Sequence, residues 1–462
     1  MSEHQNIAQF AAFDPHQIAP LCNARCMRGG AVRISNVQID SRKCTTGSLF
    51  FALKGEKVDA ISFLAQVEAN GASAVVVPFE QVSRALREVS IAVLGCDDVL
   101  SSLHSLARSY LNLIPCLQTV GITGSCGKST TKEAIARITS VLGPTARTPG
   151  NLNSEFGLPL SIFGLGRESR YGVFEMGIDH VGEMDRMVSI LKPSVAVLTN
   201  IGISHLEKMG SETTIAREKA KIFHPELKAG FVSRDCKHFD LIQAQASVSL
   251  GRYSANDIEA VDLGLEGWQL SYGGQTFRIR SVGKHLLEDV VGAIRVGAYL
   301  GADAMDIAQA LEGFEPMHGR SFVHHSRVTI VDDSYNASLD STTSILRYLS
   351  SLSWGGAKKV VLGPMKELGQ LSAEAHRSVA DTLSSCSFSK AYLYGEEMEE
   401  AAFCLKRSRF TGEVSYTKSF THLEDEVGKQ TKTGDLYLLK ASRSVGMERL
   451  IPFLQRRARS YA

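Results

Sequence analysis

The chain has 462 residues and a formal net charge of +1, with 44% hydrophobic and 21% charged residues. Such a length suggests about three domains of ordinary size, with enough apolar residues for several buried cores. The near-neutral charge gives no reason to expect nucleic acid or an anionic membrane as the main partner. No apolar run reaches the ~18 residues that a membrane span needs, so we expect no such span.

Nine cysteines are scattered along the chain without a Cys-x-x-Cys pair, which disfavours a zinc or redox site. Their odd number favours reduced thiols, as in cytosolic proteins. The first six residues, Met-Ser-Glu-His-Gln-Asn, do not resemble the start of a signal peptide, which has a basic and then an apolar region. These features predict a cytoplasmic protein.

The N-terminal part mixes short alternating strands with glycine-containing turns over residues 32–77. Within it, Ala-Val-Val-Val-Pro at 74–78 predicts a buried strand that proline ends. The apolar spacing over 99–113 predicts a helix, which Ile114 and Pro115 end. We therefore expect a small α/β domain over residues 1–115.

Strands alternate with helices in the next part of the chain. We predict strands over 119–123, 171–176 and 194–199, and helices over 128–142, 182–191 and 212–223. This alternation favours a parallel sheet with helices on both faces. It predicts a central domain over residues 116–316, built on a P-loop-type parallel sheet.

A second α/β run follows Met317, His318 and Gly319, where glycine and proline cluster and a domain boundary is expected. Its expected strands cover 328–331, 359–362, 390–393 and 436–439. The pattern predicts a Rossmann-like α/β domain over residues 317–462. The fold class is therefore α/β, with three domains.

A glycine-rich segment, Gly121-Ile-Thr-Gly-Ser-Cys-Gly-Lys-Ser-Thr-Thr131, joins the first central strand to its helix. Glycines allow a tight turn whose N–H groups face phosphate oxygens, and the helix N-terminus adds its positive end. We expect Lys128 to reach the β- and γ-phosphates of ATP and Ser129 to hold Mg²⁺. The expected ATP contacts are Thr123, Gly124, Ser125, Cys126, Gly127, Lys128, Ser129 and Thr130.

The match to the general phosphate-loop pattern is not strict. That pattern has glycine where this chain has Ile122, and the chain's own glycine comes one residue earlier. A glycine turn without a ligand is the alternative. The strand–loop–helix context and the Gly-Lys-Ser-Thr core favour the phosphate loop.

This loop and several later segments, in the same order, resemble the Mur ligases, which build the peptide precursors of bacterial cell walls. The segments are Thr148-Pro-Gly-Asn-Leu-Asn-Ser-Glu-Phe-Gly157, Phe174-Glu-Met-Gly177, Asn200-Ile-Gly-Ile-Ser-His-Leu-Glu207, Asp332-Asp-Ser-Tyr-Asn-Ala337 and Lys440-Ala-Ser-Arg-Ser-Val-Gly-Met-Glu448. They cover nearly the whole chain and are most similar to the family member that adds D-alanyl-D-alanine. The resemblance implies an ATP-dependent ligase that joins this dipeptide to UDP-N-acetylmuramoyl-tripeptide through an acyl phosphate. We expect the protein to be a monomer.

The resemblance also implies roles for single residues. Glu175 and His205 would bind Mg²⁺ with Ser129, and Lys219 would be carbamylated by CO₂ and help to hold a second Mg²⁺. Arg320 and Asp333 would reach ATP when the C-terminal domain closes. The residues implied to be catalytic are Lys128, Lys219, His205 and Arg320.

Residue chemistry alone leaves several roles open. Glu175 could be a plain carboxylate at a strand end, and histidine is a less usual Mg²⁺ ligand than oxygen. Lys219 or Lys221 could be solvated on a charge-rich helix, and Arg320 could be a surface cation.

Substrate-binding residues are implied on both sides of the central domain. Ser41 and Arg42 resemble part of the family's UDP-sugar pocket, where a guanidinium can grip two oxygens, although a solvated turn is the alternative. The remaining implied substrate residues are Asn151, Asn153, Ser154, Tyr335 and Asn336.

The chain departs from the family pattern near the adenine. The usual His-Asn-x-x-Asn reads His285-Leu-Leu-Glu-Asp289 here. Leu286 cannot bond a base, and an ionised Asp289 can only accept, for example from an adenine amino group. His285 and Asp289 stay as expected ATP contacts, and the departure supports the alternative of a nucleotide-binding module without turnover.

Two related enzymes compete with the dipeptide-adding ligase as interpretations of the sequence. The relative that adds the third, diamino residue usually carries an Asp-Asn-Pro-Arg-like stretch, which this chain lacks. A folate polyglutamate ligase lacks the UDP-sugar domain. The dipeptide-adding member therefore remains the favoured interpretation.

Overall fold

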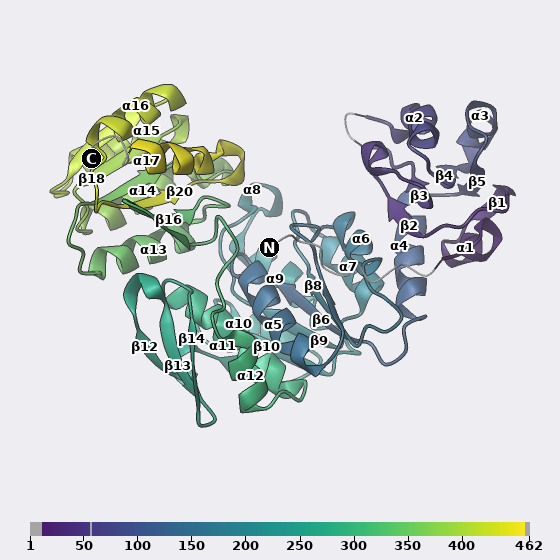
Figure 1. Ribbon diagram of the computed structural model, residues 1–462, viewed down its shortest axis with the longest axis horizontal. Coiled ribbons are helices and arrows are strands. Elements are labelled where there is room, and N and C mark those ends of the chain that lie inside the picture. Colours follow the sequence, from purple (N-terminus) through teal and green to yellow (C-terminus); the bar gives the residue numbers. More distant parts are fainter. Residues whose placement is uncertain (1–11, 56–57, 458–462) are drawn as a thin grey trace.

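The computed structural model describes residues 12–55 and 58–457. Its helices and strands form three parts, with the central part between the N-terminal and C-terminal parts (Figure 1). The described residues form four β-sheets, three of them mixed or parallel sheets covered by helices. The predicted α/β fold class is confirmed. The predicted boundaries at 115/116 and 316/317 fall in connections between elements.

The N-terminal part contains a five-stranded sheet in the order β1-β5-β4-β3-β2, in which β1 is antiparallel to β5 and the other pairs are parallel. Its strands are β1 (Arg25–Arg28), β2 (Asn36–Gln38), β3 (Ser48–Phe51), β4 (Ala74–Pro78) and β5 (Ala92–Cys96). Its helices are α1 (Pro15–Leu21), α2 (Leu64–Ala69), α3 (Val82–Glu88) and α4 (Val99–Leu111). The apolar runs of β3, β4 and β5 are buried, as expected for strands covered on both faces.

The central part is built on a six-stranded parallel sheet in the order β11-β10-β9-β6-β8-β7. Its strands are β6 (Gln118–Thr123), β7 (Thr145–Arg147), β8 (Tyr171–Glu175), β9 (Val195–Leu198), β10 (Ala229–Ser233) and β11 (Leu250–Tyr253). Its helices are α5 (Lys128–Leu142), α6 (Gly157–Ile162), α7 (Glu183–Leu191), α8 (Leu206–Met209), α9 (Glu212–Ala220), α10 (Phe239–Gln245), α11 (Lys284–Tyr299) and α12 (Ala304–Leu311).

The central part also contains an antiparallel sheet, which the alternation of strands and helices does not predict. It consists of β12 (Glu259–Asp262), β13 (Trp268–Tyr272) and β14 (Gln275–Ile279). Gly273 and Gly274 both have positive φ, of 53° and 81°, and form the two-residue turn between β13 and β14. Such a Gly-Gly turn matches the twist of a hairpin.

The C-terminal part contains a six-stranded sheet in the order β15-β16-β20-β17-β18-β19, with an antiparallel edge strand β15. Its strands are β15 (Phe322–His325), β16 (Thr329–Asp333), β17 (Lys358–Leu362), β18 (Lys390–Tyr394), β19 (Glu413–Thr417) and β20 (Leu436–Lys440). Its helices are α13 (Leu339–Ser351), α14 (Ser372–Ser384), α15 (Glu399–Lys406), α16 (Phe420–Gln430) and α17 (Leu450–Arg457).

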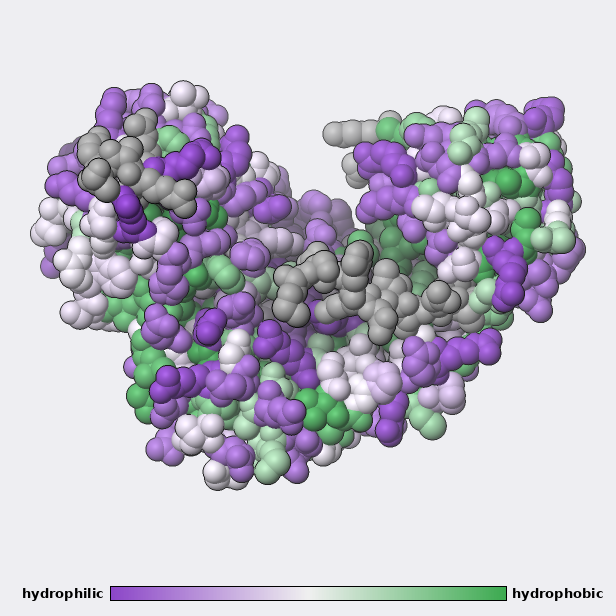
Figure 2. Space-filling view, in the orientation of Figure 1, coloured by the Kyte–Doolittle hydropathy of each residue, from purple (hydrophilic) through white to green (hydrophobic). Residues whose placement is uncertain are grey.

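The N-terminal and C-terminal parts stand on either side of a hollow that the space-filling view shows (Figure 2). Helix α4 links the N-terminal part to the central part, where the Tyr110 hydroxyl donates to the Leu165 carbonyl oxygen at 2.6 Å. In the ranges that the structure describes, no helix has the length and apolar character needed to cross a bilayer. The ends of the parallel strands β6, β8 and β9 form the carboxyl edge of the central sheet, which is where parallel sheets place their binding sites.

Candidate active site

A cavity of about 1080 Å³ lies at the carboxyl ends of the central strands and is also lined by the C-terminal part. The predicted site residues that line it are Ser125, Cys126, Gly127, Lys128, Ser129, Thr130, Asn153, Ser154, Glu175, His205, His285, Asp289, Arg320, Asp333, Tyr335 and Asn336. The predicted residues outside its lining are Ser41, Arg42, Thr123, Gly124, Asn151 and Lys219. Residues that lie far apart in the sequence therefore meet in one place.

The phosphate loop needs glycine at two positions. Gly124 and Gly127 have φ of 151° and 83°, and a Cβ on them would lie 1.9 Å from Thr199 Oγ1 and 2.2 Å from Asp289 Oδ1. The loop therefore folds tightly against β9 and α11. This close approach allows helix α5 to begin at Lys128 with its N-terminus toward the cavity.

Asn200, just after β9, holds the middle of this loop. Its Oδ1 accepts hydrogen bonds from the backbone N–H groups of Ser125 and Cys126, at 3.0 and 2.9 Å. The N–H groups of residues 127–130 have no partner among the described residues, as is usual in the first turn of a helix. Sequence alone assigns no role to Asn200, because 74 and 75 residues separate it from its partners.

Two lysine side chains share one acceptor beneath the loop. Lys128 Nζ and Lys219 Nζ both donate to the Gly124 carbonyl oxygen, at 2.7 and 3.1 Å. Burial lowers the pKa of Lys128, and burial together with repulsion from Lys128 lowers the pKa of Lys219 well below its ordinary value. Lys128 therefore lies in the lining of the cavity, and the amine of Lys219 lies directly behind it.

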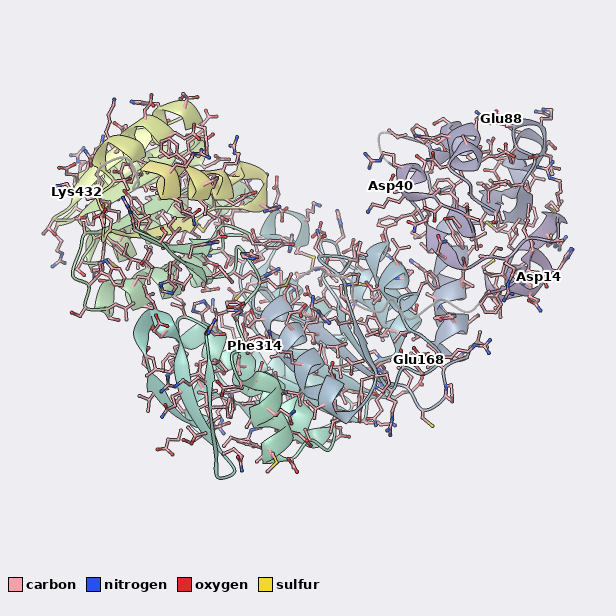
Figure 3. The ribbon with its side chains drawn as sticks, viewed as in Figure 1. Asp14, Asp40, Glu88, Glu168, Phe314 and Lys432 are labelled. Carbon is pink, nitrogen blue, oxygen red and sulfur yellow. The ribbon has the colours of Figure 1, made fainter. Side chains whose placement is uncertain are left out.

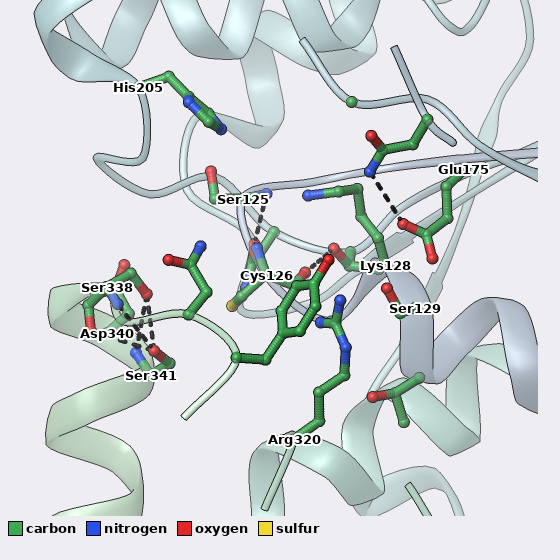
Figure 4. Close-up of a pocket in the computed structure, with 18 of the residues that line it drawn as sticks. Ser125, Cys126, Lys128, Ser129, Glu175, His205, Arg320, Ser338, Asp340 and Ser341 are labelled. Carbon is green, nitrogen blue, oxygen red and sulfur yellow. Dashed lines mark hydrogen bonds between the residues drawn. The ribbon is translucent and has the colours of Figure 1, made fainter. Parts of the chain in front are cut away.

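Glu175 ends β8 beside Lys128 (Figure 4). Its Oε2 accepts from Asn153 Nδ2 at 3.3 Å, and its Oε1 lies 3.5 Å from the ammonium of Lys132. Although only 1% of its side chain is exposed, Oε1 receives no hydrogen bond from the described residues. A carboxylate can accept about four hydrogen bonds, so Glu175 keeps lone pairs that fit a divalent cation.

His205 occupies a left-handed position, φ 60°, at the start of α8. Its Nδ1 lies 3.0 Å from Asp179 Oδ1 and 2.6 Å from Glu367 Oε2. Burial lowers the pKa of His205, but the contacts with these two carboxylates outweigh burial and raise it above its ordinary value. Sequence alone assigns no role to Asp179 or Glu367.

The described residues contain no group of three or more His, Cys, Asp or Glu side chains that is arranged to hold a metal. Mg²⁺ commonly uses one or two carboxylates together with waters and substrate phosphates. Glu175 and the nearby hydroxyl of Ser129 therefore fit a cation that a nucleotide brings with it, more than a cation held by protein groups alone.

The C-terminal part also supplies cations to the cavity, among them Arg320 (Figure 4). The guanidinium of Arg320 lies 4.1 Å from the centre of the Tyr335 ring, which holds it by a cation–π contact. Asp333 accepts from the backbone N–H of Ser321 at 3.1 Å and forms a buried ion pair with Lys440. These contacts fix the segment that carries Arg320 across from Lys128.

His285 and Asp289 lie on the first turns of α11. Burial lowers the pKa of His285 to about 4. Burial, and next the charge of Glu288, raise the pKa of Asp289 to about 8. Near neutral pH the Asp289 carboxyl therefore carries a proton and can donate as well as accept a hydrogen bond.

Ser41 and Arg42 lie apart from this cavity, in the N-terminal part. The Ser41 hydroxyl donates to Gln66 Oε1 at 3.1 Å, and Arg42 pairs with Asp40, which Figure 3 labels beside the hollow. Lys54 and Gly55 are the residues of this part that reach the cavity.

Comparisons with known proteins decide the family. The description "Mur ligase middle domain" matches residues 122–297, "Mur ligase, glutamate ligase domain" matches 319–443, and "Mur ligase family, catalytic domain" matches 33–108. The UDP-N-acetylmuramoyl-tripeptide–D-alanyl-D-alanine ligase of Treponema pallidum is 33% identical over 455 residues, which cover 95% of this chain and 97% of that protein. The chain belongs to the Mur ligase family.

Further members of this Mur ligase family match almost as fully. The ligase of the same name from Bacillus subtilis is 32% identical, covering 90% of this chain and 92% of its own. A crystal structure of MurF from Acinetobacter baumannii is 27% identical, with a TM-score of 0.86, over 97% of this chain and 99% of that one. MurF ligase of Thermotoga maritima, solved in complex with ADP, is 26% identical with a TM-score of 0.77, over 92% and 98% of the two chains.

Proposed function

We propose that this Mur ligase joins D-alanyl-D-alanine to UDP-N-acetylmuramoyl-tripeptide at the expense of ATP, giving the pentapeptide precursor of peptidoglycan, ADP and phosphate. One observation carries the proposal: the phosphate loop with Lys128, the carboxylate of Glu175 and the guanidinium of Arg320 line a single cavity. The ligases from Treponema and Bacillus, which are named for these substrates, align over at least 90% of the chain.

The chemistry explains why the site is rich in cations. The tripeptide carboxylate attacks the γ-phosphorus, the bond to the β-phosphate oxygen breaks, and ADP leaves an acyl phosphate behind. The amine of the dipeptide then attacks the acyl carbon and loses a proton, and inorganic phosphate leaves from the tetrahedral intermediate. Both steps crowd negative oxygens together, and Lys128 and Arg320 neutralise them from opposite sides.

Mg²⁺ belongs to this proposal, with Ser129, Glu175 and His205 as the residues that would hold it. The ion would neutralise charge between the β- and γ-phosphates. The hydrogen bond from Asn153 orients Glu175, and the pair Asp179 and Glu367 orients the ring of His205. For His205 to bind a metal through Nδ1, these two carboxylates must release it.

A carbamylated Lys219 is also part of the proposal. A neutral amine attacks CO₂ through its nitrogen lone pair, and the proton that it loses passes to water, which leaves an anionic carbamate. The low pKa of Lys219 favours the neutral amine that this reaction needs. Its place beside the Gly124 carbonyl oxygen puts the new anion next to Lys128.

We further propose three domains, over 1–115, 116–316 and 317–462, a cytoplasmic location and a monomeric state. Ser41 and Arg42 would bind the UDP group on the N-terminal domain, and Tyr335 and Asn336 would contact the peptide end. Asn151, Asn153 and Ser154 would contact the peptide from the central domain, on the loop that precedes α6.

An acceptor screen tests the function directly. The protein is mixed with ATP, Mg²⁺ and either UDP-muramoyl-dipeptide or UDP-muramoyl-tripeptide, with and without D-alanyl-D-alanine, and ADP release is followed. We expect ADP and a pentapeptide product when tripeptide and D-alanyl-D-alanine are both present. Turnover with the dipeptide and a diamino acid would identify the relative that adds the third residue, and background release throughout would indicate a binding module.

A further inference from the structure

Lys132 is a buried cation that the chemistry proposed above does not use. It lies on α5 one helical turn after Lys128, its side chain is 0% exposed, and it does not line the cavity. An ammonium removed from water is costly unless anionic or polar partners surround it. Its position immediately behind the phosphate loop therefore calls for a specific reason.

Three oxygens surround Lys132 Nζ. The Thr148 carbonyl oxygen accepts from it at 2.9 Å, Glu133 Oε1 lies at 2.9 Å, and Glu175 Oε1 lies at 3.5 Å. Glu133 also pairs with Arg147 at 2.8 Å through its other oxygen, so its charge is already shared. The charge of Lys132 is thus available to Glu175.

The same lysine also anchors the backbone that frames Glu175. Thr148 holds β8 twice, because its N–H donates to the Val173 carbonyl oxygen and its Oγ1 accepts from the N–H of Glu175, both at 3.0 Å. The segment from Thr148 leads to Asn153, whose side chain donates to Glu175 Oε2. Lys132 therefore lies beside Glu175 Oε1 and also binds Thr148, at the start of the segment whose Asn153 donates to Glu175 Oε2.

We propose that Lys132 is a positioning residue that holds Glu175, from the side away from the cavity, in the orientation needed for a divalent cation. The proposal rests on the proposed role of Glu175 in binding Mg²⁺. At 3.5 Å the ammonium acts on Oε1 by charge rather than by a close hydrogen bond, so it orients the carboxylate without filling its lone pairs. Lys132 does not line the cavity, so it would contact neither nucleotide nor peptide.

Mn²⁺ binding, followed by electron paramagnetic resonance with ADP present, tests this directly. In Lys132→Met we expect the dissociation constant of Mn²⁺ to rise at least tenfold, while the affinity for ADP without metal changes less than twofold. Lys132→Gln keeps a donor for the Thr148 carbonyl oxygen but lacks the charge. We expect the same loss of Mn²⁺ affinity in Lys132→Gln, since the charge is the part that acts on Glu175.

A matched control comes from a second buried lysine. Lys359 pairs with Asp435 at 2.6 Å in the C-terminal part and does not line the cavity. Lys359→Met thus removes a buried ammonium from an ion pair away from the site. We expect its Mn²⁺ affinity to equal that of the unsubstituted protein, whatever stability it loses.

Glu175→Gln separates the two proposals. If Glu175→Gln binds Mn²⁺ normally, the metal role of Glu175 fails and the role of Lys132 fails with it. If Glu175→Gln loses Mn²⁺ affinity while folded Lys132→Met and Lys132→Gln keep it, only the positioning role of Lys132 is overturned. Failure of both Lys132 variants to fold, with Lys359→Met folded, would assign Lys132 to stability and also overturn the proposal.

Discussion

At the residue scale, Lys128 is the cation of the phosphate loop that is expected to contact the β- and γ-phosphates. Its ammonium donates to the Gly124 carbonyl oxygen, 2.7 Å away, and no carboxylate of the described residues forms an ion pair with it, so its charge is not cancelled. We expect Lys128→Ala to lower kcat by 10²-fold or more, since such charge contacts contribute about 3–4 kcal/mol to the transition state. ADP release by the purified variant measures this. Near-normal turnover would refute the role, and Lys192→Ala, which removes an exposed ion pair with Glu226, should stay active.

The proposed carbamate of Lys219 can be tested by chemical rescue. If its carbamate supplies an anion, Lys219→Ala loses activity, and added short-chain carboxylates such as formate or acetate restore part of it by entering the space left. ADP release with and without the carboxylate measures the rescue. Lys221→Ala, two residues away with a side chain 27% exposed, is the control and should need no rescue. Equal effects of carboxylate on both variants would remove the support for the carbamate.

The buried carboxyl of Asp289 links stability to pH. Its pKa is raised to about 8 from an ordinary value of 3.8, so between these values the folded chain holds a proton that the unfolded chain releases. The free energy of unfolding therefore falls as pH rises from about 4 to about 8. We expect Asp289→Asn to remove this dependence and to stabilise the protein at pH 8 by at least about 1 kcal/mol.

Urea unfolding at pH 4.5, 6 and 8 checks the Asp289 prediction. The gain in free energy of unfolding from Asp289→Asn should be largest at pH 8. It should be small at pH 4.5, where the folded Asp289 carboxyl and the amide that replaces it are both neutral. Asp425→Asn, which changes the same charge at an exposed position, is the control. A gain that is independent of pH would contradict the buried, protonated carboxyl.

The residue types of the site could be predicted from sequence more readily than their partners. Lys128, Glu175 and Arg320 were expected at a nucleotide site and line one cavity. The contacts of Asn200 with the phosphate loop and of Lys132 with Glu175 could not be predicted, because each contact joins segments that are far apart in the sequence. A local motif predicts the chemistry of a loop, whereas such contacts depend on how strands are ordered in the sheet.

At the element scale, the boundary of α5 depends on Gly127. Its φ of 83° suits glycine, and a Cβ there would lie 2.2 Å from Asp289 Oδ1. We expect Gly127→Ala to shift the phosphate loop and to weaken ADP binding at least tenfold. Isothermal titration with ADP measures the affinity. Gly301→Ala has a comparable φ of 102° but nothing within 4 Å of the added Cβ, so it tests backbone strain alone and should bind ADP normally.

Regular elements were predicted best where a strand and a helix alternate strictly. Helix α5 begins and ends where it was predicted, at Lys128 and Leu142, and β4 also matches over 74–78. The antiparallel sheet β12–β14 was missed because it interrupts this alternation. Its apolar side chains, including Leu270 and Phe277, join the core that α5 and α11 share, a tertiary contact without a local signal.

At the scale of the whole molecule, the two outer parts are joined to the central part differently. Apolar side chains of α4, including Leu103 and Leu106, share one buried core with central residues such as Leu158 and Met187. The C-terminal part instead combines an apolar contact of a few central residues, Leu265, Val282 and Ile203, with polar contacts such as His205–Glu367. Large apolar interfaces restrain domain motion, so we expect the C-terminal part to move more.

Spin labels can measure this motion against a fixed reference. Cys116 is the exposed one of the nine cysteines and lies between α4 and β6, so it carries one label. Lys432→Cys on the C-terminal part and Glu88→Cys on the N-terminal part, both labelled in Figure 3, carry the second label in separate proteins. Nucleotide should pull the C-terminal part toward the phosphate loop, because Arg320 must approach the phosphates.

We expect ADP with Mg²⁺ to change the distance distribution between Cys116 and residue 432 and to leave that between Cys116 and residue 88 unchanged. ADP without Mg²⁺ should give a smaller change, since fewer charges then draw the parts together. Arg320→Ala, in the labelled background, should suppress the nucleotide-induced change because the cation that contacts the phosphates from the C-terminal part is missing. A change confined to the residue 88 pair would show that the apolar contact at α4 is the mobile one, contrary to the packing of its core.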